Sequence, residues 1–135
     1  MHTPASRTLA PRTSTVTYPG GIQHVQAVRA DLRPLLRGCP MADDVVLCAS
    51  ELAANAALHS RSRLPGGTFT VRMRINPGDH AQIEVEDDGG PWTPQVSDAT
   101  GHHGLDIVGA LASAWGVEND HTTCTAWARF DWPGR

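Results

Sequence analysis

Two neighbouring runs of alternating apolar and polar residues constrain the fold of this chain more than any other feature of its sequence. Polar residues separate the apolar positions of the two runs, which are Phe69, Val71, Met73 and Ile75, then Ala81, Ile83 and Val85. The residues between the runs, Asn-Pro-Gly-Asp at 76–79, predict a turn. A period of two is typical of a strand with one buried face, so the runs predict an antiparallel hairpin with one face buried.

Helical and extended patterns on both sides of this hairpin define the predicted fold. Residues 13–18 predict an edge strand, residues 22–37 a helix whose regular part ends near Pro34, and a second helix begins at about Ala42. After the hairpin, Leu105 to Trp115 predicts a third helix, and residues 116–118 and 124–132 predict a final hairpin. The predicted inward residues of its second strand are Cys124, Ala126, Ala128 and Phe130. The order β-α-α-β-β-α-β-β predicts an α+β fold, a two-layer α/β sandwich with a mixed sheet and helices on one face.

The length and composition favour one soluble globular domain. The chain has 135 residues, of which 40% are hydrophobic and 19% charged, and this suits a single core of moderate size. Residues 1–12, rich in Ser, Thr, Pro and Arg, predict a flexible N-terminal tail, and residues 13–135 a single domain. No run is long and apolar enough to span a bilayer, and the three cysteines have no close-pair spacing. We therefore expect reduced thiols and a cytoplasmic location.

The charged residues exclude several kinds of binding protein. All eleven basic residues are arginine. Walker-type phosphate loops and the protein kinase fold both place a lysine ammonium on phosphate, so a chain without lysine has neither. The net charge of -3 gives no broad electrostatic reason to bind nucleic acid or an anionic membrane surface.

The helix that begins near Ala42 carries polar groups on a second face. Its predicted core stripe consists of Ala42, Val45, Val46, Ala49, Leu52, Ala53 and Ala56. Glu51 and Asn55 lie one turn apart on the opposite side, flanked by Cys48 and His59. This pattern is typical of a helix that forms one wall of a cleft, although a surface helix with a solvated Glu and Asn has the same pattern.

A carboxylate continues the apolar row at the end of the first hairpin. Alternation places Asp87 on the same face as Ile83 and Val85, where an ionised carboxylate needs a hydrogen-bond donor to offset its desolvation. An exocyclic amine of a purine is such a donor, and so is a backbone N–H. Gly89 and Gly90 follow directly and allow a positive φ or the close approach of a flat ligand. An ordinary Asp-Gly turn is the alternative interpretation.

The segment before the third helix is rich in glycine and histidine. Gly101, His102, His103, Gly104 and Leu105 lead into a helix N-terminus, whose free N–H groups and positive dipole end suit phosphate. A flexible hinge is the alternative. Residues 89–103 as a whole form a long aperiodic connection, which indicates a functional loop or lid. A metal site from His102, His103, His121 and Cys124 lacks ligand spacing.

Taken together and in this order, these motifs resemble the GHKL (Bergerat-fold) ATPase superfamily. The branch they resemble most is the small stand-alone one of anti-sigma factor serine/threonine kinases and related histidine kinase-like ATP-binding proteins. The resemblance extends from about Val16 to Trp132. The matching segments are Glu-Leu-Ala-Ala-Asn-Ala at 51–56, Asp-Asp-Gly-Gly-Pro at 87–91 and Gly-Leu-Asp-Ile-Val at 104–108.

The resemblance implies a role for each matching residue. Asn55 is similar to the family's Mg²⁺ ligand, and Glu51 is similar to the general base that deprotonates the attacking hydroxyl. Asp87 would accept a hydrogen bond from the adenine amine, and Gly89 would let the ring approach. The segment Gly101, His102, His103, Gly104 and Leu105 would close over the phosphates.

The sequence departs from the family pattern at several positions. Pro91 replaces the second glycine of the first glycine motif. His102 and His103 stand where the family's second glycine motif usually has a Gly and often has an Arg. The family often places a supporting Thr near the start of the last strand, and here Thr123 and Thr125 flank the inward Cys124, which leaves that role unassigned.

The resemblance leaves two functions open. One is an ATP- and Mg²⁺-dependent serine/threonine protein kinase that phosphorylates an antagonist protein and sequesters a sigma factor. The other is a non-catalytic module that binds ATP, or only a partner protein. A fragment of a histidine kinase is disfavoured because no pair of phosphoacceptor helices precedes the domain. The partner would be a sigma factor or an anti-sigma-factor antagonist, and a homodimer is left open.

Overall fold

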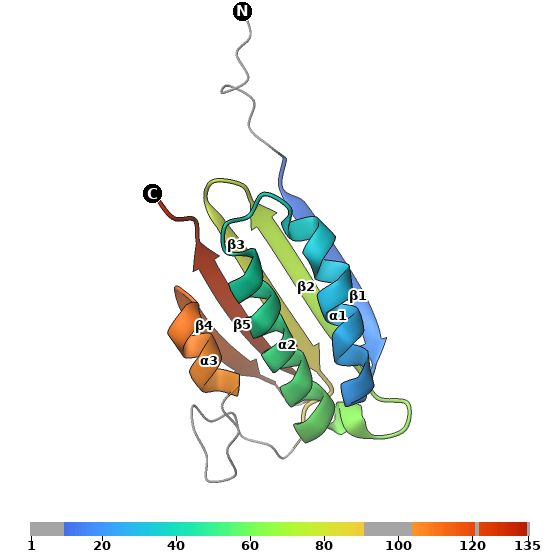
Figure 1. The fold of residues 1–135 in the computed structure, drawn as a ribbon. Coiled ribbons are helices and arrows are strands. Elements are labelled where there is room, and N and C mark those ends of the chain that lie inside the picture. The colour runs from blue at the N-terminus through green and yellow to red at the C-terminus, as the bar shows by residue number, and fades with distance from the viewer. Residues whose placement is uncertain (1–9, 91–103, 121, 135) are drawn as a thin grey trace, which may run out of the picture.

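Five strands form one sheet in the computed structural model, which describes residues 10–90, 104–120 and 122–134 (Figure 1). The strands are β1 (Arg12–Pro19), β2 (Thr68–Asn76), β3 (His80–Asp87), β4 (Ala114–Asn119) and β5 (Cys124–Asp131). Their order across the sheet is β1-β2-β3-β5-β4. All four neighbouring pairs are antiparallel.

The predicted α+β two-layer sandwich is confirmed, but the sheet is antiparallel and not mixed. The chain passes through two helices between β1 and β2, and these two strands pair in opposite directions. β3 and β4 run in the same direction, yet β5 lies between them and is antiparallel to both. Hence no parallel pair of neighbours occurs among the described strands.

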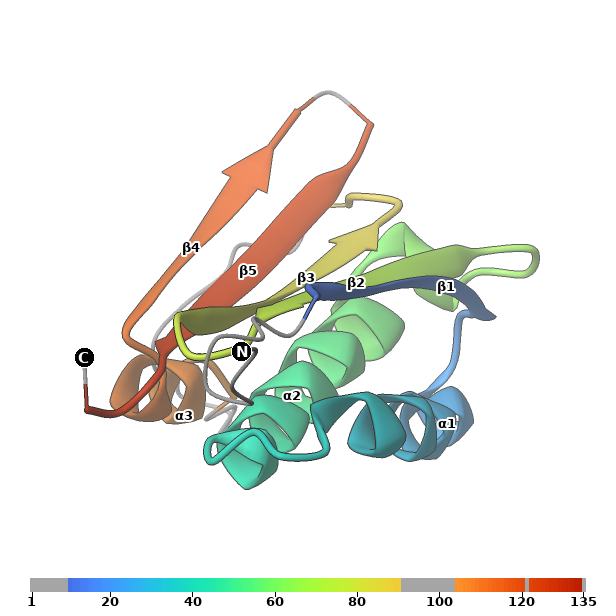
Figure 2. The same cartoon turned by 90° about the horizontal axis from the view of Figure 1, so that it is seen from above.

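Three helices cover the same face of the sheet (Figure 2). They are α1 (Val25–Leu32), α2 (Ala42–His59) and α3 (Gly104–Leu111), and the 3₁₀ turns are η2 (Ile22–His24), η3 (Arg33–Leu36) and η4 (Arg61–Arg63). α2 lies between α1 and α3 and contacts both of them as well as the sheet. None of the helices in the described ranges is long and apolar enough to cross a membrane.

The N-terminal half of the chain follows the predicted elements closely. The regular part of the first helix ends at Leu32, and Pro34 lies in the 3₁₀ turn that follows, as the sequence predicted. β1 is an edge strand and begins at Arg12, one residue earlier than expected. The Arg12 guanidinium donates hydrogen bonds to the carbonyls of Leu35 and Arg37, at 2.7 and 3.0 Å, which ties the start of β1 to the end of η3.

The third helix is shorter than the sequence predicted. The backbone N–H of Ala112 still donates to the carbonyl of Val108, but the next N–H, that of Ser113, donates to the carbonyl of Arg129 in β5. Pairing with β5 therefore replaces helical hydrogen bonding from this residue onward. Trp115, predicted to be in the helix, lies in β4 instead and still packs against the core.

The core lies between the helices and the inward face of the sheet. The inward strand residues predicted from alternation are all buried, and Phe69 and Phe130 are among the largest fully buried side chains. On α2 the predicted core stripe is buried except for Ala42, which is half-buried. Cys48, predicted to lie beside the polar stripe, is also fully buried, because α1 and α3 flank α2 and extend its buried surface.

Candidate functional site

Glu51 and Asn55 lie one turn apart on α2, and both side chains are half-buried. The exposed side chains of Leu47 and Leu58 lie before and after them along the helix. Burial raises the pKa of the neighbouring Cys48 thiol to about 12, and the negative charges of Asp44 and Glu51 add to that rise. Glu51 and Asn55 thus occupy the boundary between core and solvent, where a charged group and an amide can reach a ligand.

Asp87 is the last residue of β3 and has an exposed fraction of only 4%. One carboxylate oxygen accepts a hydrogen bond from the backbone N–H of Gly89 at 2.7 Å, and no other described group donates to this carboxylate. Burial raises the pKa of Asp87 to about 6, the Gly89 bond opposes that rise, and the charges of Asp88 and Glu86 add to it. The prediction of a buried carboxylate that needs a donor is confirmed, with the Gly89 N–H as one donor.

Gly89 and Gly90, which follow the Asp87-Asp88 pair, hold backbone conformations that residues with a side chain rarely adopt. Gly89 has φ 72° and Gly90 has φ 147°. A Cβ on Gly89 would lie 2.9 Å from the carbonyl oxygen of Thr122, and a Cβ on Gly90 would lie 3.1 Å from the backbone nitrogen of Arg61. The predicted positive φ is therefore present at both glycines, and the close neighbours in the described structure are protein backbone.

Two buried serines after α2 connect that helix to the Asp87 turn. Ser60 and Ser62 are both fully buried. The Ser60 hydroxyl donates to the carbonyl of Ala56 at 2.7 Å and accepts the N–H of Ser62 at 2.9 Å, which holds the end of α2 against η4. The Ser62 hydroxyl accepts the N–H of Asp88 at 3.0 Å and donates to the carbonyl of Thr68 at 2.5 Å.

We call this connection, made by Ser60 and Ser62, the serine clasp. Two further hydrogen bonds, each from a backbone N–H, strengthen it. The N–H of Arg61 donates to the carbonyl of Gly89 at 2.6 Å, and the N–H of Thr68 donates to the Asp88 carboxylate at 3.1 Å. The clasp therefore connects the end of α2, which carries Asn55 and Glu51, to the turn that follows Asp87. Sequence reasoning missed the role of Ser62; the available signal was a Ser-x-Ser pair directly after a helix end, a pattern typical of local side chain to backbone bonding.

Cys124, and not a threonine, is the neighbour of Asp87 on the inward face of the sheet. The two residues are register partners in β3 and β5, and both are buried. Burial and the Asp87 charge raise the pKa of the Cys124 thiol to about 11, so it is protonated at neutral pH. The Thr123 hydroxyl bonds to Asp120, and Thr125 pairs with Glu86 on the outward face.

Of the third predicted segment, residues 101–105, the structure describes only the last two, Gly104 and Leu105. Gly104 is the first residue of α3, and Leu105 is buried in the core beside Val108. Any contact of Leu105 with a ligand would therefore come from its backbone. Gly101, His102 and His103, together with the rest of the predicted loop from residue 91, lie outside the described residues.

The described residues contain no group of three or more His, Cys, Asp or Glu side chains arranged to hold a metal ion. Of the four residues weighed for a His and Cys metal site, only Cys124 belongs to this part of the chain, because His102, His103 and His121 lie outside it. Asn55, the predicted Mg²⁺ ligand, has an amide oxygen, a donor type that suits a hard cation.

Comparison with known proteins gives a family match and two fold matches. The family described as "Histidine kinase-like ATPase domain" matches residues 19–127, which is most of the chain. No curated protein matches the chain by sequence. The RsbU and RsbW domains of Rv1364c from Mycobacterium tuberculosis share the fold with a TM-score of 0.65 and 22% identity over 92% of this chain.

A second solved structure with this fold is the histidine kinase domain of the blue-light activated histidine kinase from Erythrobacter litoralis EL346. It matches with a TM-score of 0.54 and 19% identity over 82% of this chain. This chain spans 33% of the first matching structure and 60% of the second. At these identities the two structures establish the fold alone.

Proposed function

Because the chain belongs to the histidine kinase-like ATPase domain family, we propose that it binds ATP with Mg²⁺ and acts as an anti-sigma-factor-type serine/threonine protein kinase. The observation that carries this proposal is Asp87, a buried carboxylate at the end of a core strand with a hydrogen bond to only one of its oxygens among the described residues. The family match supports ATP binding, and the RsbW domain of the first structural match supports the anti-sigma-factor type.

The residues around Asp87 fit an adenine ring. The second carboxylate oxygen has acceptor capacity left, and an exocyclic amine would supply the missing donor. Such a hydrogen bond to the ionised form would also offset part of the desolvation that raises the pKa of Asp87. Gly89 and Gly90 keep the turn after Asp87 compact, because their backbone packs directly against that of Thr122 and Arg61.

The half-buried polar face of α2 would hold the phosphate end of the nucleotide. Asn55 would present its amide oxygen to Mg²⁺, and Gly101, His102, His103, Gly104 and Leu105 would cover the phosphates. Bound Mg-ATP would supply the γ-phosphoryl group and the metal charge that neutralises the phosphates. The protein's own contribution is to position these groups and to exclude water.

Glu51 would serve as the general base. It lies one turn before Asn55 on the same face of α2, so a carboxylate next to the metal ligand could hold the proton of a partner's Ser or Thr hydroxyl. A non-catalytic module that binds ATP or sequesters a regulatory protein has less need for a carboxylate at this position. The kinase is therefore the function that these residues support better, with a sigma factor or an antagonist protein as the partner.

Phosphoryl transfer by the wild type and by Glu51→Gln tests this proposal. The wild type should bind Mg-ATP and phosphorylate an antagonist-type protein, whereas Glu51→Gln should lose transfer and keep its ATP affinity within a few-fold. ATP binding without transfer or hydrolysis by the wild type would leave the binding module as the function. Equal transfer rates for the two proteins would remove Glu51 from the mechanism.

A further inference from the structure

The inward row of side chains that contains Asp87 changes from aromatic to polar across the sheet. Register places its residues on β1, β2, β3, β5 and β4 in the order Tyr18, Phe69, Asp87, Cys124 and Asn119. Tyr18 and Phe69 are buried and stack on each other, with ring centroids 5.4 Å apart. The protein therefore fills that half of the row itself. Asn119, at the other end, is exposed, so the polar half opens to solvent at β4.

Asp87 and Cys124 are neighbouring buried polar groups that the described chain leaves incompletely paired. Their exposed fractions are 4% and 3%. One oxygen of Asp87 accepts the Gly89 N–H, the Cys124 side chain has no described hydrogen bond, and none joins the two side chains. A buried thiol alone behaves as a small apolar group, but a buried carboxylate oxygen without a donor is rare in native proteins. The carboxylate beside the thiol therefore indicates a ligand at this place.

The two groups differ in hydrogen-bonding character at neutral pH. The free oxygen of the ionised Asp87 carboxylate only accepts. The pKa of the Cys124 thiol is raised to about 11 by burial and by the Asp87 charge, so its sulfur keeps the proton and can donate. These side chains come from neighbouring strands, which lie about 4.8 Å apart. A ligand that pairs with both needs a donor and an acceptor next to each other on one edge.

We propose that Cys124 is a specificity-determining residue of the nucleotide site, and that its S–H donates to N1 of adenine while Asp87 accepts from the 6-amino group. This inference rests on the proposed function, the binding of ATP at Asp87. Guanine in the same orientation presents the reverse pattern, with the O6 carbonyl facing the carboxylate and the N1–H facing the thiol. Both contacts then bring like groups together, so the pair selects a 6-aminopurine over a 6-oxopurine.

Asp87 alone would not make this distinction. An ionised carboxylate with two free oxygens can accept two donors, and guanine carries two adjacent donors, the N1–H and the 2-amino group. Here the Gly89 N–H occupies Oδ1 at 2.7 Å, so Oδ2 is the oxygen that remains. The S–H of Cys124 stands where the second donor of guanine needs an acceptor. The carboxylate therefore holds the amine, and the thiol rejects guanine.

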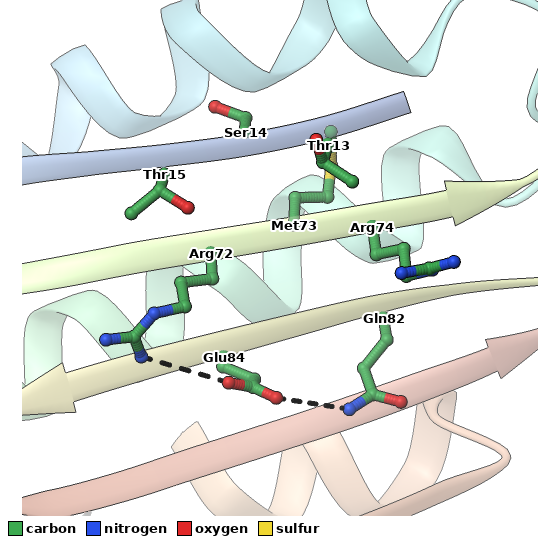
Figure 3. Close-up of a pocket in the computed structure, with 8 residues that line it drawn as sticks. All are labelled: Thr13, Ser14, Thr15, Arg72, Met73, Arg74, Gln82 and Glu84. Carbon is green, nitrogen blue, oxygen red and sulfur yellow. Dashed lines mark hydrogen bonds and ion pairs between the residues drawn. The ribbon is translucent and has the colours of Figure 1, made fainter. Parts of the chain in front are cut away.

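The hollows on the outward face of the sheet lack such a buried pair. The one drawn in Figure 3 has a volume of about 270 Å³ and lies over β1, β2 and β3. Arg72 and Gln82 both contact Glu84 there, at 3.9 and 3.3 Å. All polar side chains that line this hollow are exposed or half-buried, so water can satisfy them without a ligand. Selective recognition is therefore better supported at Asp87 and Cys124.

An isosteric pair of variants tests whether position 124 acts as a donor. Thr and Val have nearly the same shape and both suit a strand, but only Thr can donate. Cys124→Thr should bind Mg-ATP at least as tightly as the wild type, and Cys124→Val about 2- to 10-fold more weakly than Cys124→Thr, measured by calorimetric titration. Cys39→Ala removes a buried thiol outside the site and should leave the affinity unchanged. Circular dichroism checks each fold, and Cys124→Ser with Cys124→Ala gives the same comparison if Cys124→Val does not fold.

Base analogues test whether the contact is made to N1. The analogue 1-deaza-ATP lacks the N1 acceptor, so it should bind the wild type more weakly than ATP does but bind Cys124→Val as well as ATP does. The matched ligand control is 7-deaza-ATP, which keeps N1 and the 6-amino group. GTP should bind the wild type about ten-fold or more weakly than ATP, and Cys124→Val should narrow that ratio.

Two results would overturn the role of Cys124 alone. One is ATP binding with equal affinity by Cys124→Thr and Cys124→Val, and the other is an equal loss with 1-deaza-ATP in the wild type and in Cys124→Val. A wild type that does not bind ATP would instead overturn the proposed function, and this inference with it.

Discussion

At the residue scale, the burial of Asp87 conflicts with its ionisation in the protein alone. The apolar row of β3 places it in the core, with an exposed fraction of 4%, where an ionised carboxylate is costly. The Gly89 N–H satisfies one oxygen, and the charges of Asp88 and Glu86 disfavour ionisation further. A chain optimised only for stability would place an apolar residue here, so the carboxylate points to a ligand that donates to it.

The raised pKa of Asp87 predicts the pH dependence of stability. The pKa rises from 3.8 to about 6 on folding, so the protonated form is favoured in the native state. The stability from this group is present below pH 4 and is lost as pH rises through 6. Asp87→Asn does not titrate, so at pH 7 without nucleotide it should be more stable than the wild type, by up to about 3 kcal/mol.

Urea unfolding of both proteins between pH 3 and pH 8 measures this difference. The two stabilities should converge near pH 3, below both pKa values, where Asp87 is largely protonated in both states. A wild type that is more stable than Asp87→Asn at pH 7 without nucleotide would mean that the protein already satisfies the carboxylate.

Asn55 should be required for the metal and not for the fold. Its side chain is half-buried on α2 and outside the core stripe, so Asn55→Ala removes no core contact. We expect loss of the Mg²⁺-dependent part of ATP binding, measured by titration with and without Mg²⁺, and a change in Tm of no more than a few degrees. Leu58→Ala, an exposed substitution on the same helix, is the control and should alter neither. A collapse of Tm in Asn55→Ala alone would make Asn55 a structural residue.

At the element scale, the serine clasp joins the end of α2 to the turn after β3. Ser62 is fully buried and bonds to both the Asp88 N–H and the Thr68 carbonyl. Two elements far apart in the sequence are thereby held in one geometry, and they carry Asn55 and Asp87. The clasp adds to the direct packing of α2 against β3, which also positions these two residues.

Ser62→Ala should therefore affect stability and binding together. It removes the two hydrogen bonds of the Ser62 hydroxyl, to the Asp88 N–H and the Thr68 carbonyl, which at about 0.5–1.5 kcal/mol each costs about 1–3 kcal/mol of unfolding free energy. ATP affinity should fall as well, because the Asp87 turn is released. Ser113→Ala is the matched control, since the Ser113 hydroxyl accepts one exposed hydrogen bond, from the Asp131 N–H at 2.8 Å. Equal losses in the two variants would show that Ser62 has no special role.

The sequence correctly predicted the helices and strands in which the spacing of apolar residues matches the buried face in the structure. The hairpin of β2 and β3, with Asp87 facing inward, followed from strict alternation, and α2 followed from its stripe of small apolar residues. The end of α3 was missed because Ala-rich helical spacing continues past Leu111, while pairing with β5 begins at Ser113. Strand pairing between distant segments is not encoded in local periodicity.

At the scale of the whole molecule, the two faces of the sheet differ in composition. Its inward face meets the helices (Figure 2) and ends in Asp87, and its outward face carries charged residues such as Arg72, Glu84 and Glu86. The sequence predicted the two layers and most of the candidate site through the family resemblance. It did not predict the antiparallel order, which depends on β5 lying between β3 and β4. It also missed Ser62, whose partners lie 6 and 26 residues away.

Binding of ATP through Asp87 can be measured by calorimetric titration of the wild type and of Asp87→Asn with Mg-ATP. Since Asp87→Asn is expected to be at least as stable at pH 7, weaker binding cannot be attributed to unfolding. The wild type should bind Mg-ATP saturably, and Asp87→Asn should lose about 1–3 kcal/mol of binding free energy, roughly 5- to 150-fold in Kd. Equal affinities, or no binding of Mg-ATP by the wild type, would contradict it.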